Sequence, residues 1–215
     1  MLNTIYHELG HIVVGRRQGF PLTAFKIENA GHGIFHGECG ISYKPDTPYP
    51  LVLLNYFAGP LAEVRFLGNG AVIDFDRSFI PFTVANQKMS TPTRFVGAAL
   101  VNVGREVFSD DWDGVNATIQ AVKDHGEEVI YLEMFLQTLK AAIQFVNDEG
   151  NWAIITEAAQ ALAVEDALVN SAAGQTVDLL ARATELLANV PGAEKWSGAD
   201  LGAEPTPKPA PDGVQ

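Results

Sequence analysis

Two histidines and a glutamate stand near the start of the chain at a spacing that suits metal-assisted hydrolysis. The segment His7–His11 reads His-Glu-x-x-His. On an α-helix, residues i and i+4 lie on one face with Cβ atoms about 5–6 Å apart, so both imidazoles can bind one Zn²⁺ ion at about 2.0–2.1 Å. Glu8 then reaches a water on the metal, takes its proton and passes it to a leaving amine. We expect His7 and His11 as zinc ligands and Glu8 as the general base.

Gly10 lies between the two histidines. A glycine inside a helix costs about 1 kcal/mol of helix propensity, which calls for a structural reason. We expect that the missing side chain lets another backbone approach this helix closely. The alternative interpretation of the motif is an ordinary helix that carries two surface histidines.

The periodicity of apolar residues predicts the elements that must position this motif. Residues 2–18 show helical spacing, and residues 22–28 and 34–43 show the pattern of two strands joined by a glycine turn. Further helices are expected, in chain order, at 51–67 with a kink or start near Gly59-Pro60, at 92–107, from the caps in 109–113 to about residue 123, at 127–147, at 151–165 and at 174–189. Together they predict an α+β fold that is mainly helical, with a small sheet beside the first helix.

Composition narrows the class of protein. The chain has 215 residues, of which 47% are hydrophobic, and this composition favours a globular domain. Its formal net charge of -12 argues against a nucleic-acid-binding groove. Its one cysteine, Cys39, excludes a disulfide framework and fits a cytoplasmic location. We expect no signal peptide, no membrane anchor and no ATPase phosphate loop in this chain. The proline-rich segment 191–215 is predicted to be a disordered tail.

Four segments in order resemble the peptidase domain of the FtsH-type zinc proteases, most closely the small stand-alone FtsH-like peptidases of bacteria and phages. His7–Val14 resembles the family's His-Glu-Ala-Gly-His-Ala-Val-Val, and Gly37–Tyr43 lies where the family has a short strand. Phe57–Glu63 resembles its Gly-Gly-Arg-Ala-Ala-Glu helix, and Ser109–Thr118 resembles its Asn-Asp-Leu-x-x-Ala-Thr segment. The resemblance covers residues 1–190 and implies a zincin-like metallopeptidase domain there.

The resemblance also implies a third metal ligand. In the family this ligand is the aspartate that opens an Asp-x-x-x-Ala-Thr helix, which corresponds to Asp113 here. Asp110 and Asp111 remain alternatives, because the alignment can shift by two or three residues. Glu63 is another candidate, since many His-Glu-x-x-His peptidases take a glutamate from a later helix. For Glu63 we prefer the role of a carboxylate that accepts a hydrogen bond from a ligand imidazole.

The remaining candidates receive plainer interpretations. His32 and His36 are expected to be polar residues of a turn or sheet edge rather than groups that stabilise an oxyanion. Cys39 is expected to be a small core residue rather than a reactive thiol.

The predicted function is that of a zinc-dependent metalloendopeptidase that is ATP-independent in this chain. The alternative is a non-catalytic zinc-binding scaffold or a regulatory protein that retains the peptidase fold. The expected cofactor is Zn²⁺, and the expected substrate is a peptide or an unfolded protein. Because the family's ATPase ring and membrane anchor are not seen in this sequence, a separate ATPase or adaptor partner is a further expectation. The family's ring assemblies also imply a homo-oligomer.

Overall fold

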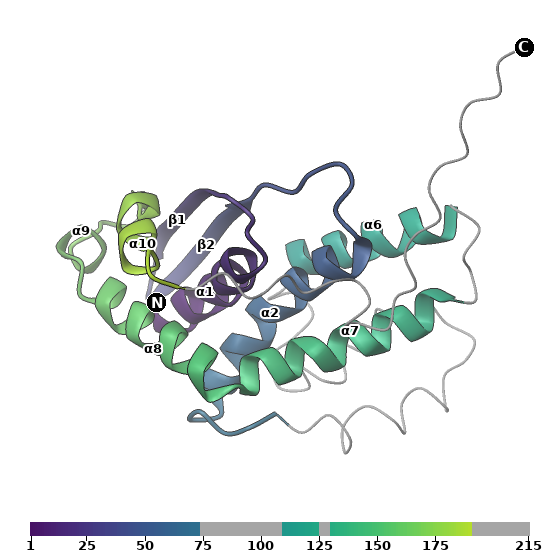
Figure 1. Cartoon of the computed structure of the whole chain (residues 1–215). Coiled ribbons are helices and arrows are strands. Elements are labelled where there is room, and N and C mark those ends of the chain that lie inside the picture. Colours follow the sequence, from purple (N-terminus) through teal and green to yellow (C-terminus); the bar gives the residue numbers. More distant parts are fainter. Residues whose placement is uncertain (74–108, 125–129, 191–215) are drawn as a thin grey trace, which may run out of the picture.

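The structure, a computed structural model, describes residues 1–73, 109–124 and 130–190 (Figure 1). Its elements in chain order are α1 (Leu2–Arg17), β1 (Leu22–Gly31), β2 (Ile34–Ile41), α2 (Tyr49–Leu67), α6 (Ser109–Asp124), α7 (Ile130–Asn147), α8 (Glu149–Ala163), α9 (Asp166–Val169), β3 (Gln175–Asp178) and α10 (Leu180–Leu186). The expected helix at 92–107 and the expected tail at 191–215 lie outside the described residues. The mixture of helices with one small sheet agrees with the predicted α+β class.

The sheet has three antiparallel strands in the order β2-β1-β3. Phe25 and Ile27 of β1 and Val177 of β3 are buried on its inner face, whereas the charged residues that alternate with them face outward. Opposite these two β1 residues, Cys39 pairs with Phe25 and Gly37 pairs with Ile27. The inner face of β2 is therefore turned toward α1, which it contacts.

The third strand corrects the prediction of a helix over 174–189. Residues 175–178 form β3, and only Leu180–Leu186 is helical. A strand of four residues is too short to show a clear two-residue alternation. It forms because its backbone pairs with β1, from Lys26 opposite Asp178 to Asn29 opposite Gln175, and this partner is distant in the sequence.

Helix α1 is the central element, since it packs against the sheet, α2 and α8. It crosses α2 at Gly10, where a Cβ atom would overlap the backbone carbonyl of Ala58 and would lie 2.9 Å from the Cβ of Ala62. The expected reason for Gly10 is thus confirmed. This close crossing brings α2 beside the face of α1 that carries the two histidines.

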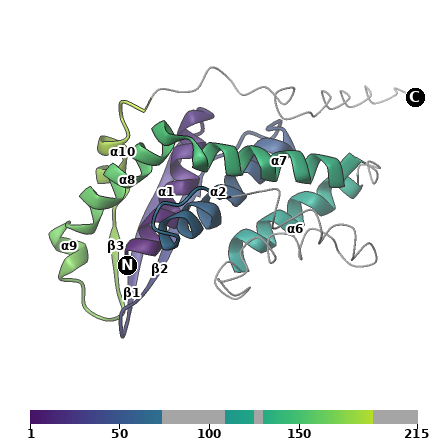
Figure 2. The ribbon, with the colours of Figure 1, turned by 90° about the horizontal axis from the view of Figure 1, so that it is seen from below.

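Helices α6 and α7 extend to the side of α2 that faces away from the sheet, as both views show (Figures 1 and 2). Helix α8 returns to α1, and α10 packs against β1 and α8. Among the helices in the described part of the chain, none combines the length and the apolar character that crossing a bilayer requires.

Candidate metal centre

The first helix brings the two histidines of the motif together. Four residues separate His7 from His11, and their Nε2 atoms lie 3.2 Å apart. Both side chains are largely buried, with 12% of His7 and 6% of His11 exposed. Two imidazole nitrogens at this separation point toward the same small volume.

Asp111, on α6, completes the group. Its Oδ2 atom lies 2.9 Å from Nε2 of His7, and its Oδ1 atom lies 3.1 Å from Nε2 of His11. Together the three side chains form a group that could hold a metal ion. Helix α6 can come close to α2 here because residue 114 is a glycine. A Cβ atom on Gly114 would overlap the ring of Tyr56.

The favoured third ligand, Asp113, is not part of this group and is exposed. We expected Asp113 to open this helix, but α6 begins at Ser109, so Asp113 lies inside it. The buried residues Val115, Thr118 and Val122 lie within about 40° of Asp111 around the helix axis, whereas Asp113 is rotated from it by about 200°. The alternative Asp111 therefore faces the histidines. The side chain of Asp110 lies outside the described part of the structure.

The second nitrogen of each imidazole has its own oxygen partner. Nδ1 of His7 lies 3.1 Å from Oε2 of Glu63, and Nδ1 of His11 lies 2.7 Å from the backbone carbonyl oxygen of Asn55. A carbonyl oxygen only accepts, so Nδ1 of His11 donates a proton to it. Glu63 thus contacts His7 on the side away from the three-residue group, in the position that we preferred for it.

Asn55 is a site residue that the sequence analysis missed. It is a buried polar residue within the apolar run Leu51–Ala58 of α2, and that contrast was the available signal. Pro60 lies inside α2, which continues through it from Tyr49 to Leu67, and it has no backbone N–H to donate to the preceding turn. Gly59 is also required there, because a Cβ atom would overlap the ring of His11.

The charges around the group favour bound positive charge. Burial lowers the pKa of His7, but hydrogen bonds to Asp111 and Glu63 outweigh it and raise this pKa to about 10. Burial also lowers the pKa of His11, but the charge of Asp111, its hydrogen bond and the charge of Glu8 together raise this pKa above its ordinary value. Burial raises the pKa of Asp111, but the two histidines outweigh it and hold this pKa below its ordinary value. Burial also raises the pKa of Glu63, and hydrogen bonds from His7 and Asn3 outweigh it and lower this pKa. A proton and a metal cation would therefore compete for the same position.

Glu8 lies between α1 and the inner face of β2. It is 6% exposed, and a Cβ atom on Gly37 would overlap its carboxylate. Cys39, two residues further along the same face of β2, also contacts this carboxylate; burial, with the negative charge of Glu8, raises the pKa of the Cys39 thiol. This agrees with the interpretation of Cys39 as an unreactive residue. Glu8 is thus held beside the group without belonging to it.

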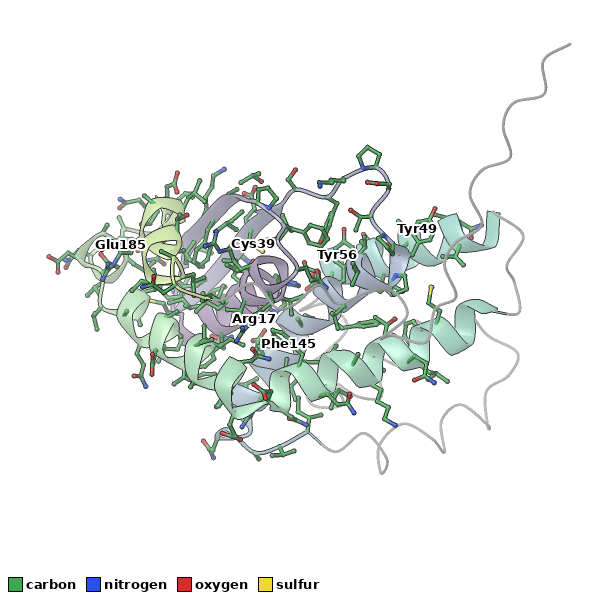
Figure 3. All side chains as sticks on the ribbon, in the orientation of Figure 1. Arg17, Cys39, Tyr49, Tyr56, Phe145 and Glu185 are labelled. Atoms are coloured by element: carbon green, nitrogen blue, oxygen red, sulfur yellow. The ribbon has the colours of Figure 1, made fainter. Side chains whose placement is uncertain are left out.

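A cavity of about 1250 Å³ opens over the group and is lined by all three of its residues as well as Glu8. Cys39 and Tyr56 both line this cavity. Figure 3 shows Cys39 near the strands over α1, and Tyr56 where α2 approaches α6. The site is therefore accessible to a molecule larger than water.

The other two candidate histidines lie apart from the group. His32 is exposed in the turn between β1 and β2 with φ of 53°. His36 is exposed on β2 opposite Glu28, on the outer side of the sheet. His32 thus lies in the turn and His36 on the edge strand, the positions expected of them, and His36 also lines the cavity.

Comparison of the chain with protein-family models, curated proteins and solved structures found no match in any of the three. The resemblance to FtsH-type peptidases therefore rests on the motifs of this sequence alone.

Proposed function

We propose that this chain is a zinc-dependent metalloendopeptidase of the zincin-like, FtsH-like type, with His7, His11 and Asp111 as metal ligands and Glu8 as the general base. The observation that carries the proposal is the convergence of three ligand atoms, with each imidazole oriented from behind by an oxygen acceptor.

The dimensions of the group suit zinc. Ligands at about 2.0–2.1 Å in a tetrahedron lie about 3.3 Å from one another. The two Nε2 atoms are 3.2 Å apart, and the Asp111 oxygens lie 2.9 and 3.1 Å from them. The separation of the two nitrogens is close to a tetrahedral edge, and Asp111 presents one oxygen to each nitrogen, Oδ2 to His7 and Oδ1 to His11. Two imidazoles and one carboxylate are also a donor set that zinc prefers in catalytic sites, where a fourth position is kept for water or substrate.

The orientation of the imidazoles supports the same proposal. A histidine binds a metal through a lone pair on one ring nitrogen, and a hydrogen bond from the other nitrogen fixes the required tautomer. Donation from Nδ1 of His11 to the Asn55 carbonyl, and from Nδ1 of His7 to Glu63, leaves both Nε2 lone pairs directed at the shared position.

Zinc, when bound, polarises a substrate carbonyl and acidifies water at the site. The chain's own contribution is the proton transfer. Glu8 adjoins His7, lines the cavity and is not a member of the group of His7, His11 and Asp111, so its carboxylate is available to take a proton from the attacking water and deliver it to the leaving amine. Gly37 supports this role, because it leaves space for the carboxylate against β2.

A peptide substrate suits the cavity. Strand β2 lines the cavity and is an edge strand of the described sheet, with β1 on one side of it. An extended peptide can pair with the backbone of such an edge. Expected self-association, a separate ATPase or adaptor partner, and the cytoplasmic location stay predictions.

The proposal is tested by measuring zinc content and cleavage of a fluorescently labelled unfolded protein for the wild type, Glu8→Gln and His7→Ala. We expect one zinc per chain and cleavage for the wild type. Glu8→Gln should keep zinc and lose about 10²–10⁴-fold in rate, the usual contribution of a general base. His7→Ala should lose both.

Two results would contradict the proposal in different ways. A wild-type chain that binds zinc but cleaves unfolded protein no faster than Glu8→Gln does favours the non-catalytic scaffold. A wild-type chain that binds no zinc removes the metal centre itself.

A further inference from the structure

Asn3 lies one helical turn before His7 and contacts the same glutamate. Its Nδ2 atom donates to Oε1 of Glu63 at 2.8 Å, and the other oxygen, Oε2, lies 3.1 Å from Nδ1 of His7. The i, i+4 spacing on α1 places both side chains on one face, above Glu63 of α2. The contacts therefore form a chain from Asn3 through Glu63 to His7.

Glu63 needs both of these donors. It is 4% exposed, and an ionised carboxylate can only accept hydrogen bonds. A buried carboxylate oxygen that loses its donor carries a large desolvation cost. The amide of Asn3 supplies the donor for one oxygen, which leaves the other directed at His7.

We propose that Asn3 is a positioning residue for the metal centre: through Glu63, it holds the imidazole of His7 in the tautomer and orientation that bind a metal. Asn3 is not a member of the ligand group, so its effect is indirect. The inference rests on the metal binding in the proposed function but not on peptidase activity.

The test compares the zinc affinity of the full-length wild type, Asn3→Asp and Asn3→Ala by competition with a chelator. Asn3→Asp keeps the shape of the side chain but replaces the donor with a second acceptor facing Glu63. Loss of a partner that orients a ligand typically weakens metal affinity about 10–100-fold, so we expect Asn3→Asp to bind zinc at least about tenfold more weakly and Asn3→Ala to lie between it and the wild type. Asn170→Asp is the matched control, because Asn170 is exposed and donates to the carbonyl oxygen of Asp166; it should bind as the wild type does.

A rescue variant separates positioning from a general effect on folding. In the double variant Asn3→Asp/Glu63→Gln, the new amide can donate to the new carboxylate and still present its oxygen to Nδ1 of His7. The double variant should therefore bind zinc as tightly as Glu63→Gln alone. A zinc affinity of Asn3→Asp equal to that of the wild type overturns the proposed role of Asn3. So does a double variant that binds zinc more weakly than Glu63→Gln by the same factor that separates Asn3→Asp from the wild type. A wild-type chain without zinc affinity overturns this inference together with the proposed function, whereas a wild type that binds zinc while Asn3→Asp is unchanged overturns this inference alone.

Discussion

Asn55 and His11 are joined by two reciprocal hydrogen bonds. The side-chain amide of Asn55 donates to the backbone carbonyl of His11 at 2.8 Å, and the imidazole of His11 donates to the backbone carbonyl of Asn55 at 2.7 Å. Both residues are buried, so water cannot replace either bond without opening the contact between α1 and α2. This pair couples the packing of the two helices to the orientation of a ligand imidazole.

Replacing Asn55 with alanine should reduce stability more than metal affinity. The variant loses the amide that bonds to the His11 carbonyl, which costs about 1–3 kcal/mol of unfolding free energy. It keeps its own backbone carbonyl, and therefore the acceptor that fixes the His11 tautomer. Urea unfolding of the metal-free protein and zinc competition measure the two effects. A zinc affinity that falls further than in Glu63→Gln would contradict this division.

The choice between two aspartates on α6 can be tested with a matched pair of variants. Asp111→Asn replaces the carboxylate that contacts both histidines, whereas Asp113→Asn changes an exposed side chain two residues away. Because residues that only orient ligands contribute about 10–100-fold to metal affinity, loss of a ligand should cost at least about 100-fold. Elemental analysis and chelator competition should show this loss for Asp111→Asn alone. Equal losses in both variants would place the third ligand elsewhere.

Gly37→Ala should impair the base while sparing the metal ligands. The added methyl group would overlap the Glu8 carboxylate and displace it from its place against β2. We expect peptide cleavage to fall about 100-fold, in the lower part of the range for loss of a general base, with zinc content unchanged. Gly150→Ala, at an exposed position on α8, is the control for a glycine replacement remote from the site. Normal cleavage by Gly37→Ala would show that Glu8 does not need this space.

Gly10→Ala should destabilise the protein although it favours a helix. The replacement usually gains about 0.5–1 kcal/mol inside a helix, but here the methyl group meets the backbone of Ala58, and overpacking of this kind costs about 1–3 kcal/mol. The melting temperature should therefore fall by several degrees. In Gly15→Ala the methyl group meets the flexible end of the Ile41 side chain at 3.0 Å, so its melting temperature should change much less. Calorimetry that ranks the two variants in the reverse order would contradict the tight crossing.

The pH dependence of stability should reverse between the metal-free and the zinc-bound protein. A pKa raised on folding, as for His7 to about 10, stabilises the metal-free fold fully below its ordinary value of 6.5, and this stabilisation is lost as the pH rises toward 10. The lowered pKa values of Asp111 and Glu63 stabilise it above their ordinary values of 3.8 and 4.5 and cease to do so as the pH falls. The metal-free protein should thus be most stable between about pH 4.5 and 6.5.

Zinc binding has the opposite trend, because the imidazoles must lose their protons to bind the metal. The rise in melting temperature on adding zinc should therefore be larger at about pH 8.5 than at about pH 6. Thermal unfolding with zinc and with a chelator, at both pH values, measures this difference. A zinc effect that is independent of pH would exclude the histidines as ligands.

Local chemistry was enough to identify one half of the metal centre. The helix that carries His7, Glu8 and His11 follows from apolar spacing along a short segment, and the i, i+4 rule then brings the two imidazoles together without any other part of the chain. The reason for Gly10 could also be predicted, because a glycine within a helix implies close packing. Alternation and a glycine turn predicted strands at 22–28 and 34–43, and the structure has them at 22–31 and 34–41.

The other half depended on contacts between segments that are distant in the sequence. The four residues 110–113 include three aspartates. Only the burial of Val115, Thr118 and Val122 on one face of α6 decides that Asp111 is the one that faces the histidines. Residues 175–178 have no strand pattern of their own and become β3 by pairing with β1. The sequence alone thus determined which side chains on α1 can bind a metal, since that depends on helix geometry within one turn. The tertiary structure decided which carboxylate joins them and what orients each ring, because those contacts depend on how separate helices pack.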